Sequence, residues 1–82
     1  MKTGKVCLLM ETDYSGKTVV ISAHVSKYTA KLAILDWVDS IRVEYADEIA
    51  DDLVEVTVGS ECAYWSDDTS GENIWILEME LQ

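Results

Sequence analysis

The sequence predicts an α+β fold in which one long helix packs on one face of an antiparallel sheet. Apolar and β-branched runs near both ends of the chain suit strands, and the long segment between them has a helical period. At 82 residues the chain has room for one small core. We therefore expect a single domain, residues 1–82, in the order ββαβββ: a β-hairpin, the helix and a β-meander.

The opening hairpin is predicted from the apolar run 5–11 and the alternating run 18–25. The turn between them contains Gly16, which can adopt positive φ. Alternation assigns the second strand's side chains to two faces: Val19, Ile21, Ala23 and Val25 on one, and Val20, Ser22 and His24 on the other.

The helix is predicted to begin after Ser26, a suitable N-cap, and to end around residues 50–52. Its apolar stripe has spacings of three and four: Ile34, Val38, Ile41, Tyr45 and Ile49. At 100° per residue, the opposite side carries a row of acidic residues: Asp36, Glu44, Asp47, Glu48 and Asp51.

Three further strands are expected at residues 53–58, 61–65 and 74–81, with a polar loop between Ser66 and Asn73. In the last strand, alternation places Leu77, Met79 and Leu81 on one face and Glu78 and Glu80 on the other. The chain contains no proline, so we expect Glu78 and Glu80 to protect this strand as a sheet edge.

The charge is strongly asymmetric along the chain. Residues 1–31 carry five Lys and two acidic residues, a net +3, whereas residues 32–82 carry one Arg and fourteen acidic residues, a net −13. The total of −10 opposes direct binding to nucleic acid or to an anionic membrane and favours a basic protein partner. No signal peptide or membrane-spanning run is recognisable, and we expect a cytoplasmic protein with reduced Cys7 and Cys62, one disulfide between them being the alternative.

Enzymatic chemistry would have to start from His24, the only imidazole, with Cys7 or Cys62 as its partner. A strand face that simply contains a Cys and a His explains the same residues, so no catalytic residues are assigned. The spacings of these residues are not those of zinc sites, and the loop Asp67–Glu72 departs from an EF-hand. We expect no enzyme activity, no metal and no cofactor.

The acidic residues are the candidate binding site for a partner: Asp36, Glu44, Asp47, Glu48 and Asp51 on the helix, and Asp67, Asp68 and Glu72 in the loop. Like charges three or four residues apart destabilise a helix, and few Lys or Arg are present to offset them. DNA carries one phosphate per ~3.4 Å of each strand, so the row could present a comparable field to a phosphate-binding groove. The alternative is a solvated face that serves only solubility.

The segments Val6–Gly16, Ser26–Ala33 and Glu78–Leu81 resemble small phage and mobile-element proteins, which often begin with a strand ending in E-x-D-Y-x-G and finish on an E-x-E-L strand. The resemblance implies inhibition of a host defence, as anti-CRISPR and anti-restriction proteins do by occupying DNA-binding surfaces.

The sequence thus leads to two functional hypotheses. The first is a non-enzymatic inhibitor, a DNA mimic, that occupies a basic surface of a host protein such as a CRISPR-Cas component. The second is a structural or assembly module that forms a homodimer through a sheet edge or exposed tryptophans.

Overall fold

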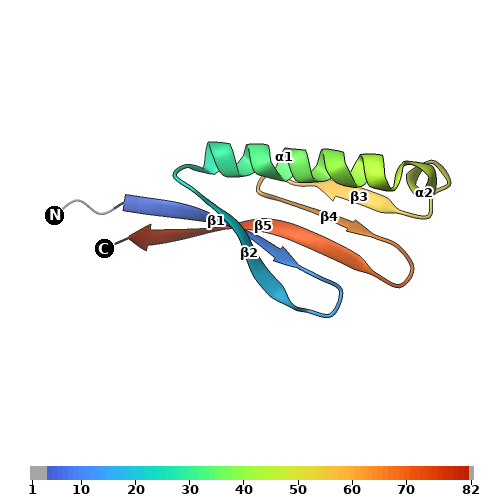
Figure 1. Ribbon diagram of the computed structural model, residues 1–82, viewed down its shortest axis with the longest axis horizontal. Coiled ribbons are helices and arrows are strands. Elements are labelled where there is room, and N and C mark those ends of the chain that lie inside the picture. Colours follow the sequence, from blue (N-terminus) through green and yellow to red (C-terminus); the bar gives the residue numbers. More distant parts are fainter. Residues whose placement is uncertain (1–3, 82) are drawn as a thin grey trace.

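The computed structural model describes the backbone of residues 4–81 and the side chains of residues 4–80, and it has the predicted α+β fold (Figure 1). Five antiparallel strands form one sheet in the order β2-β1-β5-β4-β3. The elements are β1 (Gly4–Thr12), β2 (Thr18–His24), α1 (Lys27–Glu44), α2 (Ala46–Ala50), β3 (Glu55–Val58), β4 (Cys62–Ser66) and β5 (Gly71–Leu81).

The β1–β2 hairpin forms as predicted, and Gly16 occupies its turn with φ +88°. The predicted assignment of β2 side chains to two faces is wrong on one side of a β-bulge at Ile21. Leu9 pairs with Ser22 and Met10 with Val20, so Ile21 is an extra residue without a partner on β1. An extra residue reverses the alternation. Val20 therefore lies on the face opposite to Ser22 rather than beside it.

The predicted single helix is interrupted at Tyr45, where α1 stops and the five-residue α2 begins. Ser26 caps α1 as predicted, since its Oγ accepts a hydrogen bond from the backbone N–H of Thr29 at 3.3 Å. Tyr45 leaves helical geometry (φ −110°, ψ 28°), and its ring packs on Trp65 with centroids 4.7 Å apart. The helical region still ends at Ala50, within the predicted range of residues 50–52.

The last strand is the central strand of the sheet and not an edge, because β5 pairs with β1 on one side and with β4 on the other. The edges are β2 and β3, so Glu78 and Glu80 do not protect an edge. The predicted loop from Ser66 to Asn73 is also shorter, since β5 already begins at Gly71. The predicted orientation of the Leu81 side chain lies outside the described residues.

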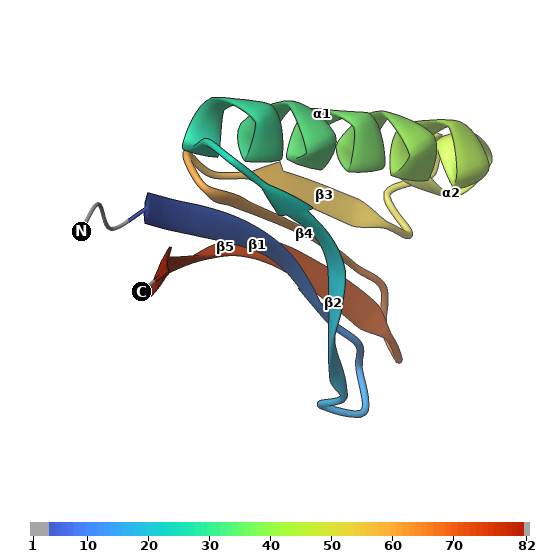
Figure 2. The same cartoon turned by 60° about the vertical axis from the view of Figure 1, so that its left-hand side comes forward.

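The core lies between α1 and the sheet (Figure 2). The predicted stripe residues Ile34, Val38 and Ile41 are buried there, whereas Tyr45 and Ile49 are half-buried. Two adjoining clusters make up this core: Leu9, Ile34, Val38, Ala63 and Ile74 in one, and Ile41, Val54 and Trp65 in the other. The helix therefore covers one face of the sheet. Alternation along β5 places the side chains of Glu72, Glu78 and Glu80 on this same face.

The opposite face of the sheet, the open face, is covered by no described helix or loop (Figure 2). Register and alternation place on it Val6, Leu8 and Met10 of β1, Val20 and Ala23 of β2, Cys62 and Tyr64 of β4, and Trp75, Leu77 and Met79 of β5. Among the described strand residues, Glu55 on β3 is the only charged one on this face. Within residues 4–81, no helix is both long and apolar enough to cross a membrane.

Candidate functional site

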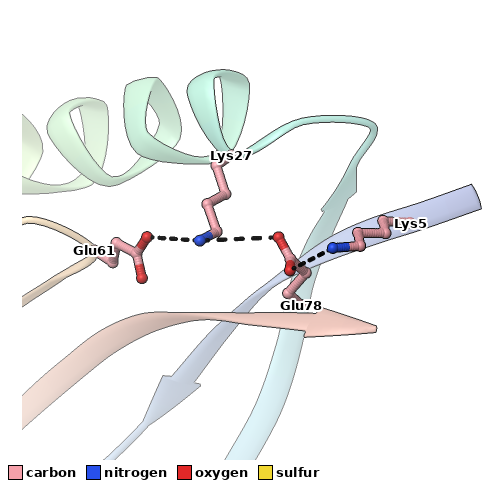
Figure 3. Close-up of polar contacts among 4 residues, drawn as sticks. All are labelled: Lys5, Lys27, Glu61 and Glu78. Carbon is pink, nitrogen blue, oxygen red and sulfur yellow. Dashed lines mark hydrogen bonds and ion pairs between the residues drawn. The ribbon is translucent and has the colours of Figure 1, made fainter. Parts of the chain in front are cut away.

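Two of the lysines are neutralised by ion pairs at the end of the molecule where α1 begins (Figure 3). Lys27 Nζ lies 3.0 Å from Glu61 Oε1 and 3.9 Å from Glu78 Oε2, and Lys5 Nζ lies 3.4 Å from Glu78 Oε1. The hydrogen bond with Glu61, followed by the negative charges of Glu61 and Glu78, raises the pKa of Lys27. This network pairs two lysines with two glutamates at this end of the molecule.

Acidic side chains gather at the other end, where α1 stops. Figure 1 shows that α2 and the β4–β5 turn both lie at this end of the molecule. Partial burial, followed by the charges of nearby carboxylates, raises the pKa of Tyr45 in their midst. We call this group of carboxylates the acidic end: Glu11, Asp13, Glu44, Glu48, Asp67, Asp68 and Glu72. They come from six parts of the fold, namely β1, the β1–β2 turn, α1, α2, the β4–β5 turn and β5, and no helical row is needed to bring them together.

Two carboxylates of the acidic end are oriented by tryptophans. Trp37 donates its indole N–H to Glu11 Oε2 at 3.2 Å, and Trp65 donates its own to Glu72 Oε1 at 3.1 Å. Burial first, then the charge of Glu72 and a hydrogen bond shared with it, raises the pKa of Glu11. Glu11 and Glu72 therefore lie close together, with their like charges held in place by the two indoles.

Two other acidic residues at this end serve the turns in which they lie. Asp67 Oδ1 accepts hydrogen bonds from the backbone N–H groups of Thr69 and Ser70, at 2.8 and 2.6 Å, and these bonds lower the pKa of Asp67. Asp13 acts similarly in the β1–β2 turn, where the hydroxyl of Ser15, 2.6 Å away, lowers its pKa. Both carboxylates therefore accept hydrogen bonds that stabilise their own turns.

Beside the Glu11–Glu72 pair there is a hollow of about 390 Å³ that is open to solvent. Carboxylates, aromatic rings and backbone of three segments line it: Asp13, Tyr14, Tyr45, Trp65, Ser70, Gly71 and Glu72. Tyr14 is 75% exposed at its rim. Aromatic faces next to carboxylates suit a guanidinium or ammonium group, which binds to both. The hollow therefore has the chemistry to receive a Lys or Arg side chain.

The structure brings together only some of the predicted site residues. Glu44, Glu48, Asp67, Asp68 and Glu72 belong to the acidic end. Asp47 and Asp51 lie on α2 and at its C-cap, exposed, and Asp36 is exposed on α1 about 12 Å before Glu44 at 1.5 Å per residue. Glu72 lies in β5 and not in a loop, because the β4–β5 turn is short.

Sequence reasoning missed Glu11, Asp13, Tyr14 and the roles of the two tryptophans. A signal for Glu11 was available. Glu11 lies two and four residues after Leu9 and Cys7, which are both buried, so alternation places its carboxylate on the helix-covered face. A carboxylate at such a position needs a hydrogen-bond donor. The pairing of β1 with β5, which places Glu72 nearby, leaves no comparable local signal.

The residues considered for catalysis lie elsewhere. Cys7 is buried and pairs in register with His24, whose Nε2 lies 2.7 Å from the hydroxyl oxygen of Ser22. Cys7 and Cys62 are free thiols, the first buried and the second exposed. Over the described part of the chain, no three His, Cys, Asp or Glu side chains form a group suited to a metal ion.

Comparison with known proteins gives no relative: no protein-family model matches the chain, and neither the curated proteins nor the solved structures include a significant match.

Proposed function

We propose that this chain is a non-enzymatic inhibitor whose acidic end occupies a basic surface of a partner protein, one that normally holds nucleic acid. The observation that carries the proposal is the Glu11–Glu72 pair, held by two indole N–H groups beside the hollow. Like charges held together reduce the stability of a fold, and such groups concentrate at functional sites. A cationic side chain of a partner would relieve this repulsion.

The surroundings of the pair support an arginine as the group that binds. Glu11 and Glu72 together offer several carboxylate oxygens, and a guanidinium can bind to two of them at once. Tyr14 and Tyr45 offer ring faces on which its plane can stack. The other carboxylates of the acidic end would steer a positively charged groove toward the hollow.

The class of partner follows from the resemblance and from this charge pattern. A groove that binds nucleic acid is lined by Arg and Lys, which are spaced to meet phosphates. The carboxylates of the acidic end lie on two turns, two helices and two strands, and they form a broad negative surface that can meet several Arg and Lys side chains at once. A host-defence nuclease or effector, such as a CRISPR-Cas component, is the partner that we propose.

The first experiment measures binding of a fluorescent oligo-arginine peptide by anisotropy. The variant Glu11→Gln/Glu72→Gln should weaken binding by about tenfold or more, because it removes the charge of Glu72, which lines the hollow, and that of Glu11 next to Glu72. The matched control is Asp36→Asn/Asp39→Asn on the exposed surface of α1, which changes the net charge equally. The control should bind within about twofold of the natural sequence if location matters beyond net charge.

Removing the like charges should stabilise the fold, so loss of binding in a test variant whose thermal unfolding is not lowered reports on the binding site. Raising the salt from about 50 to about 500 mM should also weaken binding strongly. If the two double variants weaken peptide binding equally, binding depends on the net charge and not on the position of the acidic end. The same pair of variants then tests displacement of labelled DNA from a CRISPR effector complex.

A further inference from the structure

The open face is unusual for so acidic a chain. The sequence has 22 charged residues and a net charge of −10, yet Glu55, on the edge strand β3, is the only charged residue that the described strands place there. The face carries Trp75, Tyr64, Met10 and Met79, residue types that are enriched at the centres of protein interfaces. It is a largely apolar surface with one charged residue, Glu55, at its edge.

This surface lacks the second layer that small domains normally have. Stable folds cover the apolar face of each layer, and α1 covers only the other side of the sheet (Figure 2). Leu77, Met79 and Val20 are 38%, 47% and 55% exposed. The radius of gyration is 14.4 Å, against about 12 Å for a compact domain of this length. The single chain is thus extended and incompletely covered.

The charge pattern favours an identical copy as the cover. Two copies with the same strong negative charge repel each other wherever their acidic surfaces meet, and the open face is the broad surface where they do not. A basic partner is less suited to the open face, because Glu55 at the edge is the only carboxylate that the described strands place there. A four-stranded face with strands ~4.8 Å apart and about eight residues long at ~3.3 Å each spans roughly 500 Å² in projection. The accessible surface of the face is larger than this projected area, because side chains protrude from the sheet. A standard interface buries about 800 Å² of accessible surface per partner.

We propose that two copies of the chain pack their open faces together as a twofold-symmetric homodimer. The two sheets would stack about 10 Å apart, with a helix layer on each outer side. Leu8 and Leu77, which pair in register on the open face, would lie in the interface. Both acidic ends would stay exposed, so this proposal does not depend on the proposed function.

The main experiment is sedimentation equilibrium of the protein at about 1 to 100 μM, a range that covers typical dimer affinities. The natural sequence should form a dimer. The variant Leu77→Lys/Met79→Lys should weaken the dimer by about a hundredfold or more, because four buried charges would meet across the interface. Its matched control, Leu32→Lys/Val43→Lys, adds the same charge at exposed positions on α1 and should leave dimerisation unchanged. A monomer at all concentrations, or a dimer that persists in the test variant, would overturn the proposal.

A second measurement needs no variant. Cys62 lies on the open face and is exposed in the single chain, whereas Cys7 is buried in the core. Alkylation of Cys62, followed by peptide mapping, should slow as the protein concentration rises through the dimer range. A dimer that leaves the Cys62 rate unchanged must use another surface, such as the β2 edge, and would refute the open face as the interface. Added salt should strengthen this dimer and weaken oligo-arginine binding, so the two proposals can fail separately.

Discussion

Trp65 and Glu72 face each other across the β4–β5 pair, and the indole N–H of Trp65 donates to Glu72 Oε1 at 3.1 Å. The same ring packs on Tyr45, where α1 ends. One buried side chain therefore fixes a carboxylate of the acidic end and contacts the residue at which the helix breaks. The acidic end is in this way coupled to the core, and variants near Trp65 should affect both the stability of the fold and the proposed binding.

Glu11→Gln should stabilise the protein at pH 7. The pKa of Glu11 is raised in the fold, so the folded chain keeps a proton that the unfolded chain loses near pH 4.5. Stability therefore falls as the pH rises from that value through the folded pKa, and it stays lower at pH 7. Removing the charge should recover about 0.5 kcal/mol, or about 2–4 °C in melting temperature.

The stabilisation by Glu11→Gln should shrink toward pH 4, where both forms carry no charge at this position. Calorimetry at both pH values measures the difference, and Asp36→Asn on α1 serves as the exposed control. An equal gain at pH 4 and pH 7 would show that charge repulsion is not the cause.

Asp52→Gly should also stabilise the protein. Asp52 follows the α2 C-cap with φ +59°, and the chain closes with hydrogen bonds from Leu53 N to Glu48 O at 2.8 Å and from Asp52 N to Ile49 O at 3.1 Å. This is the Schellman arrangement, in which glycine is preferred because a Cβ strains the left-handed residue.

We expect a gain of about 0.5 to 1 kcal/mol from Asp52→Gly in urea denaturation, net of the greater flexibility of glycine in the unfolded chain. Asp52→Asn tests the charge alone, since asparagine tolerates the same backbone. Asp52→Ala should destabilise the protein. A stabilising alanine would contradict the backbone explanation.

Gly71→Ala should destabilise the fold and weaken peptide binding together. A Cβ at position 71 would lie 2.7 Å from the carbonyl oxygen of Trp65, a backbone atom that cannot move without disturbing the β4–β5 pair. Overpacking of this kind costs about 1–3 kcal/mol. Gly4→Ala is the control, because nothing lies within 4 Å of a Cβ there. Chemical denaturation of both variants, with the peptide titration, decides whether the two effects occur together.

Ile74→Val tests the burial of β5 beneath α1. Ile74 has no exposed surface and belongs to the main core cluster, so loss of one methylene should cost about 1 kcal/mol. Val43→Ala on α1, at a side chain that is 80% exposed, should change stability little. If the Ile74 side chain were not buried beneath α1, the two costs would be similar.

The fold class and the order of elements could be predicted because they depend on local patterns. Alternation in residues 18–25 and the apolar stripe through Ile34 and Val38 are properties of short windows. The bulge at Ile21 and the break at Tyr45 are not, since both depend on partners in other segments.

The candidate site was predictable only in part for the same reason. Glu72 and Glu11 are 61 positions apart, and only the β1–β5 pairing brings them together. The candidate residues predicted from the charge asymmetry include five of the seven carboxylates that the structure gathers at the acidic end. However, the charge asymmetry assigned Glu11 and Asp13 to the basic part of the chain, because net charge along a sequence says nothing about which segments meet in space.

The pairing of Gly4 with Leu81 has a mechanical consequence. Because β1 and β5 are antiparallel neighbours, residues 4 and 81 lie side by side, and a force that separates them opens the β1–β5 hydrogen bonds one after another. Strands pulled in this direction unzip and do not shear, so the fold should yield at low force when it is stretched from these two positions. A protease that threads its substrates from one end would find the central strand of this sheet easy to peel away.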